Sequence, residues 1–188
     1  MAQAIAHIQA RKVATAFTSA DISMHIVPTY WDVATTVELD PCVVLAHMML
    51  ASDRMQSRWA QPGIYNLAEV GVITSESRAN TPVPDDAHNW AWFADQNRWK
   101  KGLTFANLAD GVVAHVGRLV AYALAPAQRT TAQNDLVTRA LLMRSLPPTF
   151  HGIAPTVSGL DHRWKYPGPR YGERLALIAE EMRTTVVR

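Results

Sequence analysis

The stretch that decides the fold is DPCVVLAHMMLASDRMQSRW, residues 40–59. Asp40 can accept hydrogen bonds from the free N–H groups of a first helical turn, and Pro41 suits a first helical position, which needs no donor. One face of such a helix would carry Val43, Val44, His47, Leu50 and Ala51. Because this spacing gives an apolar face wide enough for burial, the sequence predicts a central helix from Pro41 to about Asp53–Met55.

The composition is that of a globular protein of ordinary size. The chain has 188 residues, of which 48% are hydrophobic and 18% charged, and its net charge is +2. This mild charge, spread along the chain, does not favour nucleic acid as a partner. The sequence contains no run of eighteen apolar residues, so membrane insertion is not predicted. The first residues lack the pattern of a secretory signal, so none is expected. Cys42 is the only cysteine, and we expect a buried, inert thiol.

Around the central helix, the pattern predicts an Ala-rich N-terminal arm or helix over residues 1–17 and a single domain over residues 18–188. Pro28 either breaks or restarts a helix. Residues 64–74, which follow Gln61-Pro62-Gly63, show β-like alternation, whereas the polar residues 75–89 predict a surface loop. Further helices are expected over 110–124, over 131–146, and in the tail from Leu160 to Met182. In the first of them, Asp110 can cap the helix and Gly117 allows another helix to approach closely.

An aromatic cluster follows the predicted loop. It contains Trp90, Trp92, Phe93, Trp99 and Phe105. Two interpretations stay open: the rings pack in the core, or they form a platform on which the apolar faces of sugar rings stack.

Four motifs, in order over about residues 20–185, resemble the glucosaminidase family of peptidoglycan hydrolases. They are Asp40-Pro41 with Leu45-Ala46; Asn66, Ala68, Gly71 and Val72; the segment from Asp110 to Tyr122-Ala123 with His115; and Trp164 followed by Tyr171. The resemblance implies a mainly α (α+β) lysozyme-like fold, in which a helical domain surrounds the central helix. A small irregular or β lobe, between about residues 60 and 105, would form a cleft beside it.

The position at which the family carries its catalytic Glu is occupied by Ala51. Glycoside cleavage needs a carboxylic acid that protonates the leaving oxygen, and losing it typically removes about 10²- to 10⁴-fold in rate. Asp53 and Glu69 are the substitutes to consider. Asp53 would lie about 200° around a continuing helix from Ala51, so it could act only if the helix had ended. Departures at His47, Asp53 and Glu69 indicate natural loss of the acid rather than an engineered change.

The resemblance therefore implies a degenerate glucosaminidase-fold protein. It would act as a structural or peptidoglycan-binding component, such as part of a phage tail or baseplate, located in the virion or in the host cytoplasm before release. Its partners would be glycan strands and other virion proteins. The alternative is an active endo-N-acetylglucosaminidase with a relocated carboxylate. Substrate contacts are expected from Trp59, Tyr65, Asn66, Trp90, Trp92 and Tyr122. His residues lack metal-ligand spacing and His115 is interpreted as structural, so we expect no metal or cofactor.

Overall fold

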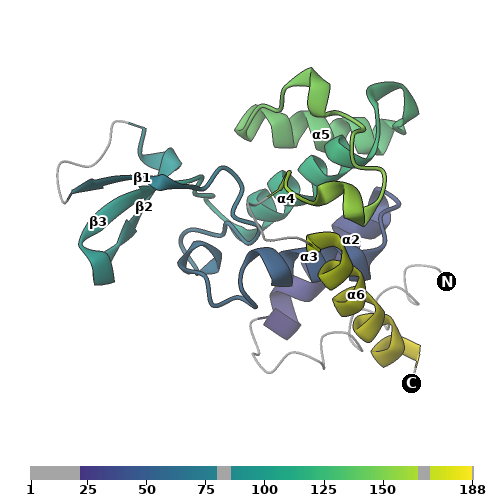
Figure 1. Ribbon diagram of the computed structural model, residues 1–188, viewed down its shortest axis with the longest axis horizontal. Helices are drawn as coiled ribbons and strands as arrows, with labels where there is room; N and C mark the ends of the chain where they lie inside the picture. Colours follow the sequence, from purple (N-terminus) through teal and green to yellow (C-terminus); the bar gives the residue numbers. More distant parts are fainter. Residues whose placement is uncertain (1–21, 80–85, 165–169, 188) are drawn as a thin grey trace. The chain divides into compact units, whose positions relative to one another are not determined.

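The computed structural model describes residues 22–79, 86–164 and 170–187 and is mainly helical, with one small antiparallel sheet (Figure 1). These residues form two compact units. The helical unit contains the described residues up to His47 and from Val112 onward, and the sheet unit runs from Met48 to Gly111. The predicted mainly α fold with a small β part is confirmed. The expected N-terminal arm, residues 1–17, lies outside the described residues.

The helical unit begins with a π-helical turn, Ile22–Ile26, which continues into helix α2, Val27–Thr36. Pro28 lies in the first turn of α2, where N–H groups need no acceptor within the α-helix and proline is best tolerated. The chain is helical on both sides of Pro28 and changes from π-helix to α-helix beside it, so of the two interpretations of Pro28, restarting the helix is the one observed. The remaining helices are α3, Pro41–Ala51; α4, Leu108–Ala123; α5, Thr131–Met143; and α6, Tyr171–Val187.

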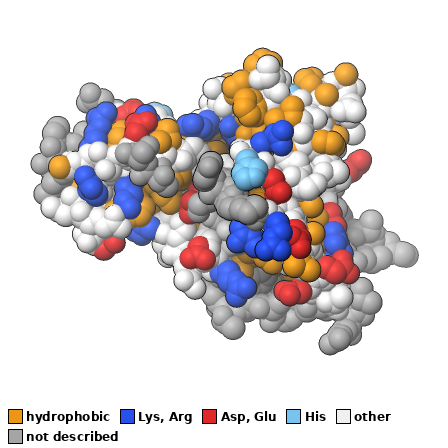
Figure 2. Space-filling view, in the orientation of Figure 1, with side chains coloured by type: hydrophobic (Ala, Val, Ile, Leu, Met, Phe, Trp, Pro, Cys, Tyr) orange, Lys and Arg blue, Asp and Glu red, His pale blue; other side chains and the backbone are white. Residues whose placement is uncertain are grey.

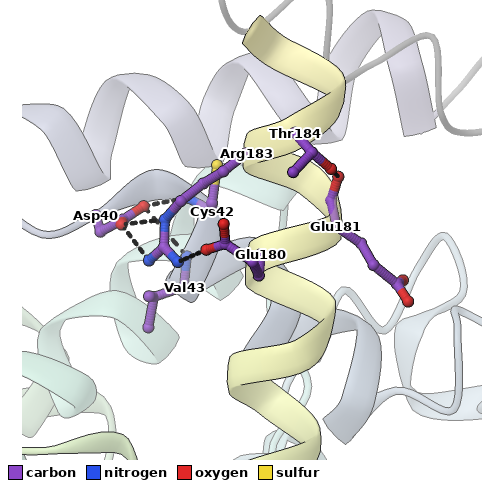
Figure 3. A network of polar contacts seen from close by, with 7 residues as sticks. All are labelled: Asp40, Cys42, Val43, Glu180, Glu181, Arg183 and Thr184. Carbon is purple, nitrogen blue, oxygen red and sulfur yellow. Dashed lines mark hydrogen bonds and ion pairs between the residues drawn. The ribbon is translucent and has the colours of Figure 1, made fainter.

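Helix α3 starts as its sequence predicts. Oδ1 of Asp40 accepts from the backbone N–H groups of Cys42 and Val43, at 2.8 and 3.4 Å. Oδ2 accepts from Nε and Nη2 of Arg183 on α6, at 3.1 and 2.6 Å, while Nη1 of Arg183 donates to Glu180 at 2.9 Å (Figure 3). One carboxylate thus caps α3 and fastens α6 to its first turn.

Helix α3 is buried on nearly all sides, and not on one face only. Its buried residues are Cys42, Val44, Leu45, Ala46, His47, Met48 and Ala51. A helix that is apolar all round is typical of the centre of a core, so the expected single face was too narrow. Burial, and next the charge of Asp40, raise the pKa of the Cys42 thiol to about 11. The expected buried thiol is confirmed, and it is protonated at neutral pH.

Helix α3 also ends earlier than expected, at Ala51. Asp53, Arg54 and Met55 have φ angles of 49°, 52° and 66°, a left-handed turn that cannot continue a right-handed helix. The hydroxyl of Ser52 accepts from the N–H of Met55 at 3.0 Å and supports this turn. The predicted end at Asp53–Met55 is therefore wrong by one short turn.

The sheet unit contains strands β1, Ile73–Ala79; β2, Trp90–Phe93; and β3, Arg98–Lys101. All pairs are antiparallel, and β3 lies between β1 and β2 (Figure 1). Of residues 64–74, where we expected β structure, residues 64–72 form turns, and β1 begins at Ile73 and occupies part of the expected loop. Positive φ angles at Gly63, Tyr65, Glu69 and Gly71 explain this shift, because strands do not contain such residues.

Two helix contacts refine the sequence predictions. Asn107, and not Asp110, caps α4: its Oδ1 accepts from the Asp110 N–H at 2.9 Å, and Asp110 lies in the first turn. Gly117 of α4 lies against α5, since a Cβ added there would be 2.6 Å from Cβ of Ala140. The predicted close approach at Gly117 is confirmed, although α5 ends at Met143, before the expected residue 146.

Candidate functional site

The position expected to hold the catalytic acid contains no acid. Ala51 is the last residue of α3 and is fully buried. The next side chain, Ser52, is also fully buried, and its hydroxyl lies 3.9 Å from Sδ of Met48. Neither a methyl group nor an alcohol among apolar neighbours can deliver a proton to a glycosidic oxygen near neutral pH.

The two candidate carboxylates differ in how firmly they are held. Asp53 is exposed on the left-handed turn after α3. Glu69 is half-buried, and its Oε1 accepts from the Ser57 hydroxyl at 2.7 Å. A general acid is best placed in partly apolar surroundings that favour its protonated form. Asp53 does not have such surroundings, so Glu69 is the only one of the two with a fixed position and partial burial.

Most of the predicted substrate-binding residues have structural roles in the described part of the chain. Trp59 packs on Phe93 with ring centroids 5.4 Å apart, inside a buried cluster with Ile64 and Ala91. Asn66 is fully buried; its Nδ2 donates to the carbonyls of Val70 and Leu103, both at 2.9 Å. Trp59 and Asn66 therefore help to build the sheet unit.

The remaining predicted residues lie in different environments. Tyr65 is half-buried at a φ of 52°, and Trp92 is half-buried on β2. Tyr122 is buried on α4 in the helical unit, where its hydroxyl donates to the carbonyl of Arg163 at 3.5 Å. The six predicted residues thus belong to two units, and only Tyr65 and Trp92 present part of their rings to solvent. Their role as substrate contacts stays a prediction.

Alternation along the strands gives the sheet two faces. Ala91 and Phe93 point to the inner face, where they join the buried cluster around Trp59. The opposite face, which we call the outer face, carries Trp92 of β2 directly across from Trp99 of β3. Their ring centroids are 5.4 Å apart with an interplanar angle of 56°, and both side chains are half-buried. Sequence analysis placed Trp99 in the aromatic cluster but did not select it as a site residue.

Charged side chains of both signs surround these rings. Trp90, also on the outer face, is buried beneath Arg78, whose guanidinium carbon lies 4.6 Å from the ring centroid. Nε1 of Trp90 donates to Asp86 at 2.9 Å. Nζ of Lys101 lies 2.8 Å from Glu76 in an ion pair that is partly exposed to solvent. The outer face therefore combines two partly accessible indole rings with two cations and two carboxylates.

The helical unit contains a buried chain of four polar side chains from four helices. The Tyr30 hydroxyl lies 2.9 Å from Nδ1 of His115, and Nε2 of His115 lies 2.9 Å from Nδ1 of His47. Nε2 of His47 lies 3.3 Å from the Tyr171 hydroxyl. The Trp164 ring meets His47 edge-on, with centroids 4.5 Å apart. All four chain members are buried, so His115 has the structural role expected from the sequence.

Both imidazoles of this chain are neutral. Burial lowers the pKa of His47 to about 3. Burial, and then the proximity of His47, lower the pKa of His115 well below its ordinary value. A neutral imidazole has one donor and one acceptor nitrogen, so the bond between the two rings needs one N–H and one bare nitrogen. The chain can satisfy all its members without a charge, and it offers no proton exchange near neutral pH.

One shallow groove of about 370 Å³ lies on the helical unit between α2, α4 and α5. Apolar side chains form much of its lining, which consists of Asp32, Val33, Thr36, Val37, Val113, Ala132, Asp135, Leu136 and Arg139. None of the predicted site residues lines it. Within the described ranges, no three His, Cys, Asp or Glu side chains are grouped to hold a metal ion. Nor does any described helix have the length and apolar character that a membrane span requires.

Comparison with known proteins gives one distant relative. An uncharacterized protein of Borreliella burgdorferi is 28% identical over 97 residues, which is 52% of this chain and 43% of the relative. The chain thus spans less than half the length of that protein. No family model matches the chain, and no solved structure matches it.

Proposed function

We propose that this protein is a non-catalytic glycan-binding or structural protein with a degenerate glucosaminidase-type, lysozyme-like fold. The observation that carries the proposal is Ala51, a buried methyl group at the end of the central helix where the resembled family has its acid. Loss of the acid removes proton transfer, whereas stacking and hydrogen bonds to a glycan do not depend on it. Peptidoglycan strands are the proposed ligand, and location in a phage particle stays a prediction, which mass spectrometry of purified virions can test.

Two features support glycan binding over a purely structural role. Trp92 and Trp99 keep part of their rings accessible on a sheet that is only three strands wide. Large aromatic rings with a partly exposed face are typical of sites that take an amphipathic ligand. Charged groups beside them, such as Arg78, can hydrogen-bond to hydroxyl groups.

The alternative is an active peptidoglycan glycosidase that uses Glu69. Its half-buried carboxylate, held by the Ser57 hydroxyl at 2.7 Å, is the observation in favour. A zymogram on purified cell walls separates the two functions. We expect no lysis from the pure protein but retention on insoluble peptidoglycan at low salt. Lysis that Glu69→Gln abolishes, while Asp53→Asn leaves it intact, would establish the alternative and refute the non-catalytic proposal.

Restoring the acid tests the state of the vacated position. Because Ala51 is fully buried, Ala51→Glu should lower the free energy of unfolding by several kcal/mol, the cost of a large and unpaired buried carboxyl group. Ala51→Gln is the matched control, since it adds nearly the same volume without a titrating group. A loss that is larger for Glu at neutral pH and equal in acid would isolate the charge. A stable, lytic Ala51→Glu protein would instead show an open site that lacks only its acid.

A further inference from the structure

We infer that the outer face of the three-stranded sheet is a saccharide-binding surface, on which Trp92 and Trp99 stack against the rings of a neutral chain of β-linked pyranoses. This inference rests on the proposed function and deepens it, because it places glycan binding on the sheet and not beside Ala51. In the space-filling view, basic and acidic side chains lie around apolar surface on the part of the molecule that contains the sheet (Figure 2).

The first argument is the cross-strand indole pair. Trp92 and Trp99 face each other on neighbouring strands, with centroids 5.4 Å apart, and neither ring is fully buried. Burying an indole completely would have gained more hydrophobic free energy, as the inner-face residues Ala91 and Phe93 achieve. The pair therefore leaves apolar aromatic surface available to a ligand. Pyranose rings with equatorial substituents have flat C–H faces that suit such surface.

The second argument is the polar rim that the neighbouring strand positions supply. The planar guanidinium of Arg78, an exposed residue, lies over the buried Trp90 ring, with its carbon 4.6 Å from the ring centroid. The Glu76 carboxylate, 46% exposed, is held by Lys101. Arg78 offers donors and Glu76 offers acceptors. A sugar hydroxyl can therefore accept a hydrogen bond from Arg78 and donate one to Glu76. Trp90 thus acts as a support for Arg78 and not as a stacking ring.

The charge balance favours a neutral sugar over a nucleic acid. On the outer face, Arg78 and Lys101 are offset by Glu76 and Asp86. Polyphosphate ligands need uncompensated cations, because neutralising phosphates supplies most of their binding free energy. The further cations of β3, Arg98 and Lys100, occupy inner-face positions opposite Phe93 and Ala91. Nζ of Lys100 lies 4.6 Å from the centroid of the Phe93 ring.

The size of the aromatic surface favours a sugar over a protein partner. Two indole side chains could contribute at most about 500 Å² even if fully accessible. A stable protein interface buries about 800 Å² on each partner. A few pyranose rings need much less area, so the outer face matches a short stretch of glycan.

The test is binding of the full chain to a soluble β-1,4-linked N-acetylglucosamine oligomer, followed by titration calorimetry and tryptophan fluorescence. Trp92→Leu and Trp99→Leu keep apolar volume but remove the aromatic face, and each should weaken binding at least tenfold. Arg78→Gln should weaken it several-fold. Trp164→Phe, which changes an indole of the helical unit, is the matched control and should bind as the wild type does. Circular dichroism verifies that each variant is folded; a variant that unfolds is replaced by Trp→Tyr at the same position, which should bind with intermediate affinity.

The outcomes separate this inference from the proposed function. If the wild type and both Trp→Leu variants are retained equally on peptidoglycan, the outer-face site is overturned and the proposed glycan binding stays intact. No retention by the wild type on peptidoglycan or on the oligomer would overturn both. The wild type could instead bind a single-stranded oligonucleotide more tightly than the sugar, with that binding lost in the same variants. This result would identify the ligand as a nucleic acid and also overturn the inference.

Discussion

Acid should destabilise this protein through the two buried imidazoles of the chain Tyr30–His115–His47–Tyr171, and His47→Gln should remove about half of that effect. In the unfolded chain an imidazole has a pKa of about 6.5. In the folded protein, burial holds the pKa of His47 at about 3 and that of His115 well below its ordinary value. Below about pH 6.5 the unfolded state therefore binds more protons than the folded state, and the free energy of unfolding decreases as the pH is lowered.

The magnitude follows from the distance between the chosen pH and the unfolded pKa. A pH of about 5 lies about 1.5 units below the unfolded pKa, and each unit corresponds to about 1.4 kcal/mol. Each imidazole that stays neutral in the fold therefore lowers the free energy of unfolding by about 2 kcal/mol at that pH. The two together give about 4 kcal/mol, a large part of the 5–15 kcal/mol that is typical of whole domains. This cost is absent well above about pH 6.5, where the imidazoles are neutral in both states, and it grows as the pH falls toward the folded pKa values.

The assay is urea unfolding followed by circular dichroism at about pH 7.5 and pH 5, with the difference compared between variants. Glutamine can donate and accept as a neutral imidazole does, so His47→Gln keeps the partners of His115 and Tyr171 while removing one titrating group. It should reduce the pH-dependent loss by about 2 kcal/mol. His25→Gln, at an exposed position of the first turn, should retain the wild-type loss. An equal loss in wild type and His47→Gln would refute the reasoning.

Three further substitutions test the packing. Gly117→Ala should lower the free energy of unfolding by about 1–3 kcal/mol in a urea titration, because its Cβ would lie 2.6 Å from that of Ala140. Asp40→Ala should cost about 1–2 kcal/mol by removing the α3 cap together with an exposed ion pair; Arg183→Gln should cost less than 1 kcal/mol, and an equal cost would contradict the capping role. Asn66→Ala should lower the melting temperature by several degrees, because it leaves buried backbone groups at Val70 and Leu103 unpaired; a calorimetric scan identical to that of the wild type would contradict its structural role.

The candidate site was only partly predictable. The missing acid at Ala51 is a property of the sequence, given the resemblance, and so are the positions of the remaining carboxylates. The difference between Asp53 and Glu69 depends on a turn and on a hydrogen bond from Ser57. The selection of Trp92 and Trp99, and not Trp90, depends on strand pairing and on the position of Arg78. From the sequence alone, Trp90 and Trp92 were selected and Trp99 was not.

Features that neighbouring groups in the chain specify can be predicted from the sequence. Asp40 and Pro41 start α3 because the cap and the first turn are neighbours in the chain. Helices α4 and α6 have apolar spacing that identifies them without reference to any partner. Gly117 marked a close helix contact because only a residue without a side chain fits one. A small irregular or β lobe was expected, but the one stretch of predicted alternation, residues 64–74, lies mostly before β1.

Features that join distant segments depend on how the whole chain folds. His47 and His115 are 68 positions apart and meet in one hydrogen bond. The side-chain amide of Asn66 donates a hydrogen bond to the carbonyl of Leu103, 37 positions away, and fixes turns where alternation predicted a strand. Helix α3 is apolar on nearly all sides in its own sequence, but its link to α6 joins Asp40 to Arg183, 143 positions away. Local propensities fix where helices can begin, whereas burial and polar pairing depend on which segments meet, and that is decided by packing of the whole chain.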